Sequence, residues 1–416
     1  MSRAFSALQD PDLRRDSRDF SRHGPLTPEL LTTILLFMVA DANTRGYDLL
    51  LQALWSEARD HGLKLPTEHP IAGPSFCEAR EKIKPELLRR MVHEVATHAY
   101  EDTSTSRRWR GRRVFALDGT KINLQRSEHL HRHFATPHDA HCPQLLLSML
   151  LDVCAKHPVD FEIGPFASDE RAHLFAVLPS LAEGDLIILD RGYPSHEIIQ
   201  VLTQAKVDFL IRVPASHTFR AVDDLIASGQ RENACVLSPP DGSPSDWAPL
   251  SLRVVRTVAP SGDDAYFLTS LRSDDCAVEE LGALYHMRWE VEEFFKLLKG
   301  DYIGQGQFRS KSSTGVRQEA SALVLFLAIT RLCAEAVDDG VEHRRGAPAQ
   351  KAAVLAMASR LTRILLPEDT QRVLHEIGLL LQAMAATRYR KRPNRSFPRV
   401  SKRPTSRWTA TGRRGA

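Results

Sequence analysis

Three acidic residues, Asp118, Asp190 and Glu292, lie next to predicted strands or in a predicted helix that could bring them close together. Asp118 follows the apolar run at residues 114–117, and Asp190 follows the apolar run at residues 186–189. Each run is bounded by turn residues and predicts a buried strand, so each aspartate is expected just past a strand end. Because the ends of neighbouring strands can lie side by side, the two aspartates are expected to be adjacent. Glu292 lies further along the chain in a stretch with helical periodicity.

These residue types suit one kind of chemistry. Carboxylates held close together repel one another, and a bound divalent cation is the usual compensation. Two Mg²⁺ ions about 4 Å apart can activate an attacking oxygen and stabilise a leaving oxygen at a phosphodiester. Asp118, Asp190 and Glu292 are therefore the ingredients of a two-metal phosphoryl-transfer site. The alternative for each aspartate taken alone is a turn residue, since Asp before Gly is common in turns.

The stretch at residues 281–300 carries two patterns, which we interpret as one helix. At about 100° per residue, its apolar side chains form a core-facing stripe: Leu284, Met287, Val291, Phe294, Phe295 and Leu298. A second arc beside the stripe is polar: Tyr285, Arg288, Glu292, Lys296 and Lys299. Glu290 and Glu293 fall on the outward arc, which leaves Glu292 as the acid. The alternative is that Arg288, Glu292 and Lys296 form only ordinary ion pairs one turn apart.

The composition is that of a globular protein. The chain has 416 residues, 43% hydrophobic and 26% charged, enough for a large core and two or three domains. A net charge of +3 is too small to indicate nucleic acid by itself. Six cysteines without a CxxC pair suit a reducing cytosol, and the N-terminus lacks an apolar signal core. The apolar runs at 30–40 and 322–334 fall short of the roughly 20 residues that span a bilayer, so we expect buried helices, no membrane and a cytoplasmic protein.

Shifts in pattern divide the chain into six segments. We expect an α/β protein whose core is flanked by helical N- and C-terminal regions. The predicted segments are 1–105 (helical, DNA-binding or scaffolding), 106–206 (first part of the core), 207–277 (a β-rich insertion), 278–340 (end of the core, with Glu292), 341–386 (helices that could dimerise) and 387–416 (a basic, disordered tail).

Three motifs carry a resemblance to a known family. They are LDGTKI around Asp118, the DRGY string that begins at Asp190, and a Y-x2-R-x3-E-x6-K pattern at Tyr285, Arg288, Glu292 and Lys299. With them the chain resembles the DDE transposases of bacterial insertion elements, specifically the insertion-sequence-four group. Secondary matches are Pro143–Gln144, Trp289 and the FRS string at residues 308–310. The resemblance covers about residues 75–335.

The resemblance implies a fold and an activity. It implies an RNase H-like catalytic core, with Asp118, Asp190 and Glu292 binding Mg²⁺ or Mn²⁺, two ions per site. Tyr285, Arg288 and Lys299 would contact DNA, and we count Trp289 with them. The family works as a homodimer that brings two element ends together, and it cleaves DNA and transfers strands by cut-and-paste. The expected partners are the terminal inverted repeats and target DNA, so the protein would associate with the nucleoid when DNA-bound.

Two other functions stay open. One is a related RNase H-like nuclease that cleaves without strand transfer. The other is a catalytically silent relative that binds DNA ends.

Several other features carry weaker hypotheses. The His-rich loop at 129–142 fits no usual zinc spacing, and we interpret it as a partly basic loop near DNA. Trp247 could stack a flipped base or could pin a turn. Gly304 and Gly306 form no phosphate-binding loop, so no nucleotide cofactor is expected. The tail interleaves basic residues with Tyr389, Phe397 and Trp408, which suits phosphate backbones or simple solubilisation.

Overall fold

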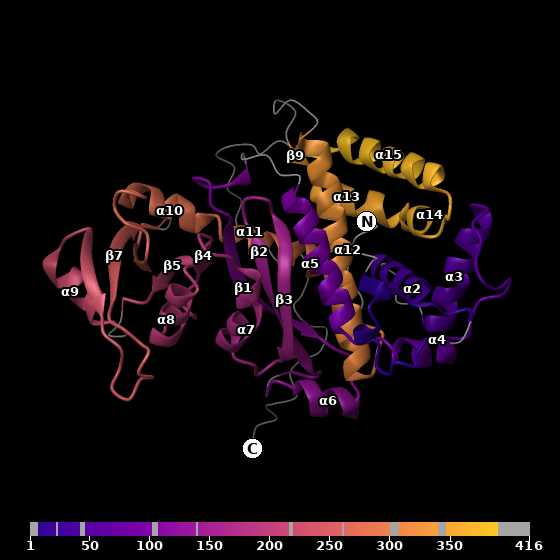
Figure 1. Ribbon diagram of the computed structural model, residues 1–416, viewed down its shortest axis with the longest axis horizontal. Helices are drawn as coiled ribbons and strands as arrows, with labels where there is room; N and C mark the ends of the chain where they lie inside the picture. The colour runs from indigo at the N-terminus through magenta and orange to yellow at the C-terminus, as the bar shows by residue number, and fades with distance from the viewer. Residues whose placement is uncertain are drawn as a thin grey trace, which may run out of the picture.

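The computed structural model describes residues 7–21, 24–41, 46–101, 107–138, 140–215, 219–259, 262–299, 308–339 and 347–389. Within these ranges a mixed sheet of eight strands forms the centre, with helices on both faces (Figure 1). The strands are β1 (Val114–Asn123), β2 (Gln144–Asp152), β3 (His157–Pro165), β4 (Leu186–Leu189), β5 (Asp208–Val213), β6 (Glu232–Leu237), β7 (Leu250–Val258) and β8 (Asp264–Thr269).

The first five strands have a distinctive order. Their spatial order across the sheet is β3-β2-β1-β4-β5. The strands β1, β2 and β3 form an antiparallel meander, whereas β4 pairs parallel with β1 and β5 pairs parallel with β4. The short β4 is buried on both faces, as its unbroken apolar run predicts. This arrangement confirms the expected α/β, RNase H-like core.

The β-rich segment at residues 207–277 is continuous with this sheet. Its first strand, β5, is a core strand because it pairs with β4. The strands β8, β7 and β6 then extend the sheet beyond β5 in antiparallel pairs, as the left side of Figure 1 shows. The segment therefore widens the core sheet. The domain boundaries proposed from the sequence stay predictions.

Helices from both ends of the chain cover one face. The N-terminal helices are the short 3-10 turns η1 (Ala7–Gln9) and η2 (Pro11–Leu13), then α2 (Pro28–Ala40), α3 (Tyr47–Asp60), α4 (Gly73–Arg80) and α5 (Glu86–Glu101). The α2 helix begins where the sequence predicts, because the Thr27 side chain accepts the Leu30 N–H and proline occupies the first turn. The α5 helix packs on β3, and both α2 and α5 pack on α12 (Ser313–Asp339).

The α12 helix is the buried spine of this face. By length and composition alone it could cross a membrane, but most of its apolar window is buried inside the protein. Its neighbours are α2, α5, α13 (Gln350–Ala358) and α15 (Thr370–Ala386). The expected buried helix at residues 322–334 is therefore confirmed as part of α12.

The C-terminal helices return toward the N-terminal ones. The α14 helix (Leu361–Leu365) contacts α2 and α3, and β9 (Ala347–Pro348) pairs with β10 (Arg388–Tyr389). The first residues of the predicted disordered tail thus form a short strand. Residues 390–416, with Phe397 and Trp408, lie outside the described residues, as do Gly304 and Gly306.

The opposite face of the sheet has its own layer. It is covered by α7 (Glu170–Val177), α8 (His196–Gln204) and α9 (Arg220–Ser228), whose apolar side chains form a second hydrophobic cluster with the sheet. The remaining helices are α6 (Glu128–Phe134), η4 (Leu178–Ser180), α10 (Val278–His286) and α11 (Trp289–Leu297).

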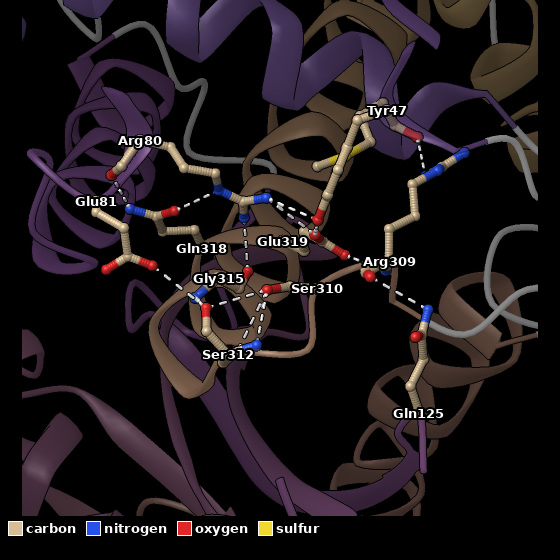
Figure 2. A network of polar contacts seen from close by, with 11 residues as sticks. Tyr47, Arg80, Glu81, Gln125, Arg309, Ser310, Ser312, Gly315, Gln318 and Glu319 are labelled. Atoms are coloured by element: carbon tan, nitrogen blue, oxygen red, sulfur yellow. Dashed lines mark hydrogen bonds and ion pairs between the residues drawn. The ribbon is translucent and has the colours of Figure 1, made fainter. Parts of the chain in front are cut away.

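A buried polar network joins the N-terminal helices to α12 (Figure 2). Arg80, only 2% exposed, donates to Gln318 Oε1 and to the Gly315 carbonyl, each at 2.8 Å, and pairs with Glu319 Oε1 at 3.2 Å. The other Glu319 oxygen accepts the Arg309 N–H at 2.5 Å. Because Arg309 belongs to the FRS string, the network fixes the loop that leads into α12.

Candidate active site

Asp118 lies in the middle of β1. The strand continues through Gly119 to Asn123, and β2 pairs with it throughout, with Asp118 opposite Met149 and Gly119 opposite Ser148. The turn expected after Asp118 is therefore wrong, because a neighbouring strand supplies partners that the sequence alone does not reveal. The pairing that does end here is that between β1 and β4, whose last pair is Ala116 with Ile188.

The register of these two parallel strands places the aspartates together. Asp118 lies two residues beyond Ala116, and Asp190 lies two residues beyond Ile188. Because side chains alternate along a strand, each aspartate shares the face of the paired residue two positions before it. Burial raises the pKa of the Asp118 carboxyl; Arg288 opposes this effect, and Asp190 adds to it by charge repulsion. The Asp190 carboxylate accepts the Gly192 N–H at 2.8 Å.

The stretch that carries Glu292 is divided into two helices. The predicted single helix is wrong, because α10 ends at His286 and α11 begins at Trp289. At the junction, the N–H groups of Arg288 and Val291 donate to the carbonyls three residues earlier, which tightens the backbone. The junction presents Arg288 toward β1 while Glu292 stays one turn away on α11.

Arg288 connects two of the predicted acids. Its Nη1 donates to Asp118 Oδ2 at 2.9 Å, and its Nη2 donates to Glu292 Oε1 at 2.8 Å. The Arg288 side chain is 15% exposed. Burial alone would lower the pKa of its guanidinium, but Tyr285, Asp118 and Glu292 outweigh it and raise the pKa. Among the described residues, Arg288 Nε has no hydrogen-bond partner. The arginine is thus a cation held between carboxylates.

The donor set suits a divalent metal. Carboxylate oxygens are the ligands that Mg²⁺ and Mn²⁺ prefer, and the guanidinium already fills the place of a cation between Asp118 and Glu292. In the part of the chain that the structure describes, no three acidic, histidine or cysteine side chains are grouped closely enough to hold a metal. Arg288 therefore occupies the space between Asp118 and Glu292 that a bound cation would share.

The other predicted residues lie at different depths. Tyr285 is half-buried in α10, with its ring 4.9 Å from the Phe267 ring and 5.8 Å from the Arg288 guanidinium carbon. Trp289 is 38% exposed at the start of α11. Lys299 is exposed just after α11. Tyr285 and Arg288 thus line the site, whereas Trp289 and Lys299 are exposed at the two ends of α11. These positions leave the proposed DNA contacts untested.

A fourth acid, missed by the sequence reasoning, lies at the same place. Glu170 begins α7, and a side-chain carbon added at Gly119 would lie 2.6 Å from its carboxyl carbon. Burial raises the pKa of Glu170, and the charges of Asp118 and Asp190 raise it further. The glycine of the LDGT string was the available signal, because a residue without a side chain allows another group to approach the strand.

The His-rich loop and Trp247 lie elsewhere. In α6, the His129 and His133 rings stack at 4.1 Å, and His129 faces Ser313 at 3.3 Å. Trp247 is half-buried in the connection between β6 and β7. Neither feature contacts the acids through a described interaction, and the hypotheses about both stay predictions.

Comparison with known proteins adds a family and a fold. Residues 109–330, more than half of the chain, match the family described as "Transposase DDE domain". The structure is similar to the cryo-EM structure of a piggyBac transposase synaptic complex with hairpin DNA. The TM-score is 0.50 at 11% identity, over 95% of this chain and 83% of that chain. At this identity the likeness shows the fold alone. No curated protein matches the chain.

Proposed function

Because the chain belongs to the family of DDE-domain transposases, we propose that it is a DNA transposase of the insertion-sequence-four group. It cleaves the ends of its element and joins them to target DNA by cut-and-paste. The observation that supports the proposal is that Arg288 bridges Asp118 and Glu292, while the β1–β4 register brings Asp190 beside Asp118. The Y-x2-R-x3-E-x6-K pattern supports the choice of group.

DDE transposases use divalent metal ions, and the proposed site is made of hard oxygen donors. We propose that Asp118, Asp190 and Glu292 hold two Mg²⁺ or Mn²⁺ ions. When bound, such ions activate the attacking oxygen and stabilise the leaving oxygen of the phosphodiester. The carboxylates fix the position of the reacting phosphate, and the buried floor beneath them, Ala116 and Ile188, excludes water from one side.

The basic and aromatic residues beside the acids are proposed to hold DNA. Arg288, once it leaves Asp118, presents a planar guanidinium suited to two phosphate oxygens. Tyr285 supports Arg288 through its ring, while Lys299 and the exposed Trp289 extend the surface. The similar solved structure is a synaptic complex with hairpin DNA, which supports element ends as the partner. By the same proposal, the protein works as a homodimer on DNA within the nucleoid.

The first test is nicking of a supercoiled plasmid in Mn²⁺, which relaxes metal and sequence demands. The wild type is compared with Glu292→Gln and with a matched control, Glu293→Gln, whose carboxylate is turned outward toward Lys296. We expect nicking by the wild type and the control and none by Glu292→Gln. Nicking that survives Glu292→Gln would contradict the assignment of Glu292.

The second test separates catalysis from binding. Asp118→Asn and Asp190→Asn are expected to abolish cleavage while DNA binding, measured by gel shift, is largely retained. An equal loss of binding would contradict a catalytic role. A strand-transfer assay with the flanking DNA of the element then detects products joined to target; cleaved ends without joined products would indicate the nuclease function instead.

A further inference from the structure

Glu170 lies against the strand that carries Asp118. It begins α7, where the Asp169 side chain accepts the Arg171 N–H and caps the helix. A side-chain carbon at Gly119 would be 2.6 Å from both Cδ and Oε1 of Glu170, closer than real carbon atoms approach. The carboxylate therefore rests on the backbone directly after Asp118. Any side chain at Gly119 would displace it.

The sheet is open at this place. The last pair between β1 and β4 is Ala116 with Ile188, so beyond it no strand among the described residues pairs with that edge of β1. Asp118 and Gly119 point to opposite faces of the sheet, because side chains alternate along a strand. Asp118 thus approaches the open edge from the face of α11, and Glu170 approaches it from the face of α7. Asp190 continues from β4 into the same gap.

Two contacts link α7 to the loop that carries Asp190. The Tyr193 hydroxyl donates to Glu170 Oε2 at 3.3 Å, and Arg171 Nε donates to the Gly192 carbonyl at 3.0 Å. Tyr193 is only 1% exposed, so its hydroxyl has a fixed position. The first turn of α7 therefore connects the Asp118 strand with the Asp190 loop.

A third contact fixes the helix on the sheet. His173, one turn after Glu170, contacts Ser148 Oγ through Nδ1 at 2.8 Å in the buried interior. Ser148 is the residue that pairs with Gly119 in the β1–β2 register. The packing of α7 on the sheet thus fixes the position of Glu170 beside Gly119.

In the described part of the chain, Glu170 forms no direct ion pair, although the Lys121 charge partly offsets the repulsion from Asp118 and Asp190. Three buried acids there have an arginine partner: Asp160 has Arg89, Asp185 has Arg113, and Glu319 has Arg80. Buried Asp152 instead accepts the Tyr100 hydroxyl and two backbone N–H groups. In the described ranges, Glu170 forms no ion pair; its hydrogen-bond partner is neutral Tyr193. A half-buried carboxylate beside two further carboxylates is unfavourable without a cation.

We propose that Glu170 is a fourth carboxylate of the divalent-metal site, reaching the cations through the gap beyond the end of β4. The inference rests on the proposed function, because it extends the same site by one residue. It assigns the LDGT glycine a role: Gly119 leaves room for the fourth carboxylate.

Metal affinity tests this inference without any reaction. Free Mn²⁺ is measured by its electron paramagnetic resonance signal during titration of the full-length protein in the absence of DNA. The variants are Glu170→Gln, Asp118→Asn, Tyr193→Phe and the outward-facing control Glu293→Gln. We expect Glu170→Gln to weaken Mn²⁺ binding roughly tenfold, while Tyr193→Phe and Glu293→Gln bind like the wild type.

Each other outcome overturns a defined claim. Wild-type affinity in Glu170→Gln, with loss in Asp118→Asn, would overturn the inference and leave the proposed function intact. Equal weakening in Glu170→Gln and Tyr193→Phe would make Glu170 a structural partner of Tyr193 and overturn its role toward the metal. Wild-type affinity in Asp118→Asn, or no Mn²⁺ binding by the wild type, would overturn the metal site itself.

A second variant, Glu170→Asp, keeps the test decisive if Glu170→Gln does not fold. Circular dichroism monitors folding of every variant. Glu170→Asp keeps the charge but withdraws the carboxylate by one methylene group. It is expected to show weakened Mn²⁺ binding with an unchanged fold, and wild-type affinity in a folded Glu170→Asp would count against direct contact with the metal.

Discussion

Replacing Arg288 by glutamine should lower stability in the absence of metal and increase the effect of metal. The arginine makes one charged hydrogen bond to Asp118 and one to Glu292, at 2.9 and 2.8 Å. A hydrogen bond to a charged group contributes about 1.5–3 kcal/mol when well buried, whereas an exposed ion pair contributes about 0–1 kcal/mol.

The exposure of the three side chains sets the expected magnitude. They are 15%, 20% and 34% exposed for Arg288, Asp118 and Glu292, between the two limits and with the Glu292 contact the more screened. We therefore expect Arg288→Gln to lose roughly 2 kcal/mol of unfolding free energy without metal. If the guanidinium competes with the metal, its removal should tighten Mn²⁺ binding. Tenfold tighter Mn²⁺ binding would add about 1.4 kcal/mol to the unfolding free energy of the variant at saturating metal.

The assay is urea unfolding with and without Mn²⁺. The difference in unfolding free energy between the wild type and Arg288→Gln should decrease to below about 1 kcal/mol when Mn²⁺ is added. Lys296→Gln is the matched control, because Lys296 lies on the same helix but pairs outward with Glu293; its deficit should not depend on metal. A deficit for Arg288→Gln that grows or stays constant with Mn²⁺ would refute the competition.

Three further predictions concern the interior. Arg80→Met should cost about 3–5 kcal/mol by leaving Glu319 buried without its cation, and Arg80→Met with Glu319→Gln should recover most of it in urea unfolding; a double variant as unstable as the sum of the singles would contradict this account. Gly164→Ala should cost about 1–3 kcal/mol, since the new carbon would meet the Ser168 hydroxyl; an unchanged melting temperature would argue against close packing there. Burial, with Arg331 and Arg107, lowers the pKa of His157 from 6.5 to about 3. Below pH 6.5, the His157 imidazole is therefore protonated in the unfolded chain but stays neutral in the folded chain. The free energy of unfolding consequently decreases as the pH is lowered from 6.5 toward 3. The loss between pH 8 and pH 5 should be about 2 kcal/mol smaller in His157→Leu; equal losses in both proteins would exclude this effect.

Local patterns were sufficient to predict the core strands β1 and β4, although β1 continues beyond Asp118. The unbroken apolar runs before Asp118 and Asp190 predicted β1 and β4, because a strand buried on both faces needs no alternation. The motif around Arg288 and Glu292 led to the family that residues 109–330 match.

What the sequence did not predict depends on contacts between distant segments. Gly119 lies within a strand because β2 pairs with it, and the break before Trp289 arises where the backbone tightens next to β1. The position of Glu170 depends on how α7 packs on the sheet, which helical periodicity cannot reveal. The bridge from Arg288 to Asp118 joins residues far apart in sequence, so the i,i+4 pair with Glu292 was the only part visible in advance.

The separation of the acids along the chain has a consequence for synthesis. Asp190, the later of the two aspartates, leaves the ribosome about 100 residues before Glu292, which at typical elongation rates corresponds to roughly 5–20 s. During that interval the chain that forms β5 through β8 is synthesised, and α11, which packs on β1, follows it. A growing chain thus holds two aspartates without the glutamate or its arginine. The order of synthesis delays assembly of a DNA-cutting site until nearly three quarters of the polypeptide exists.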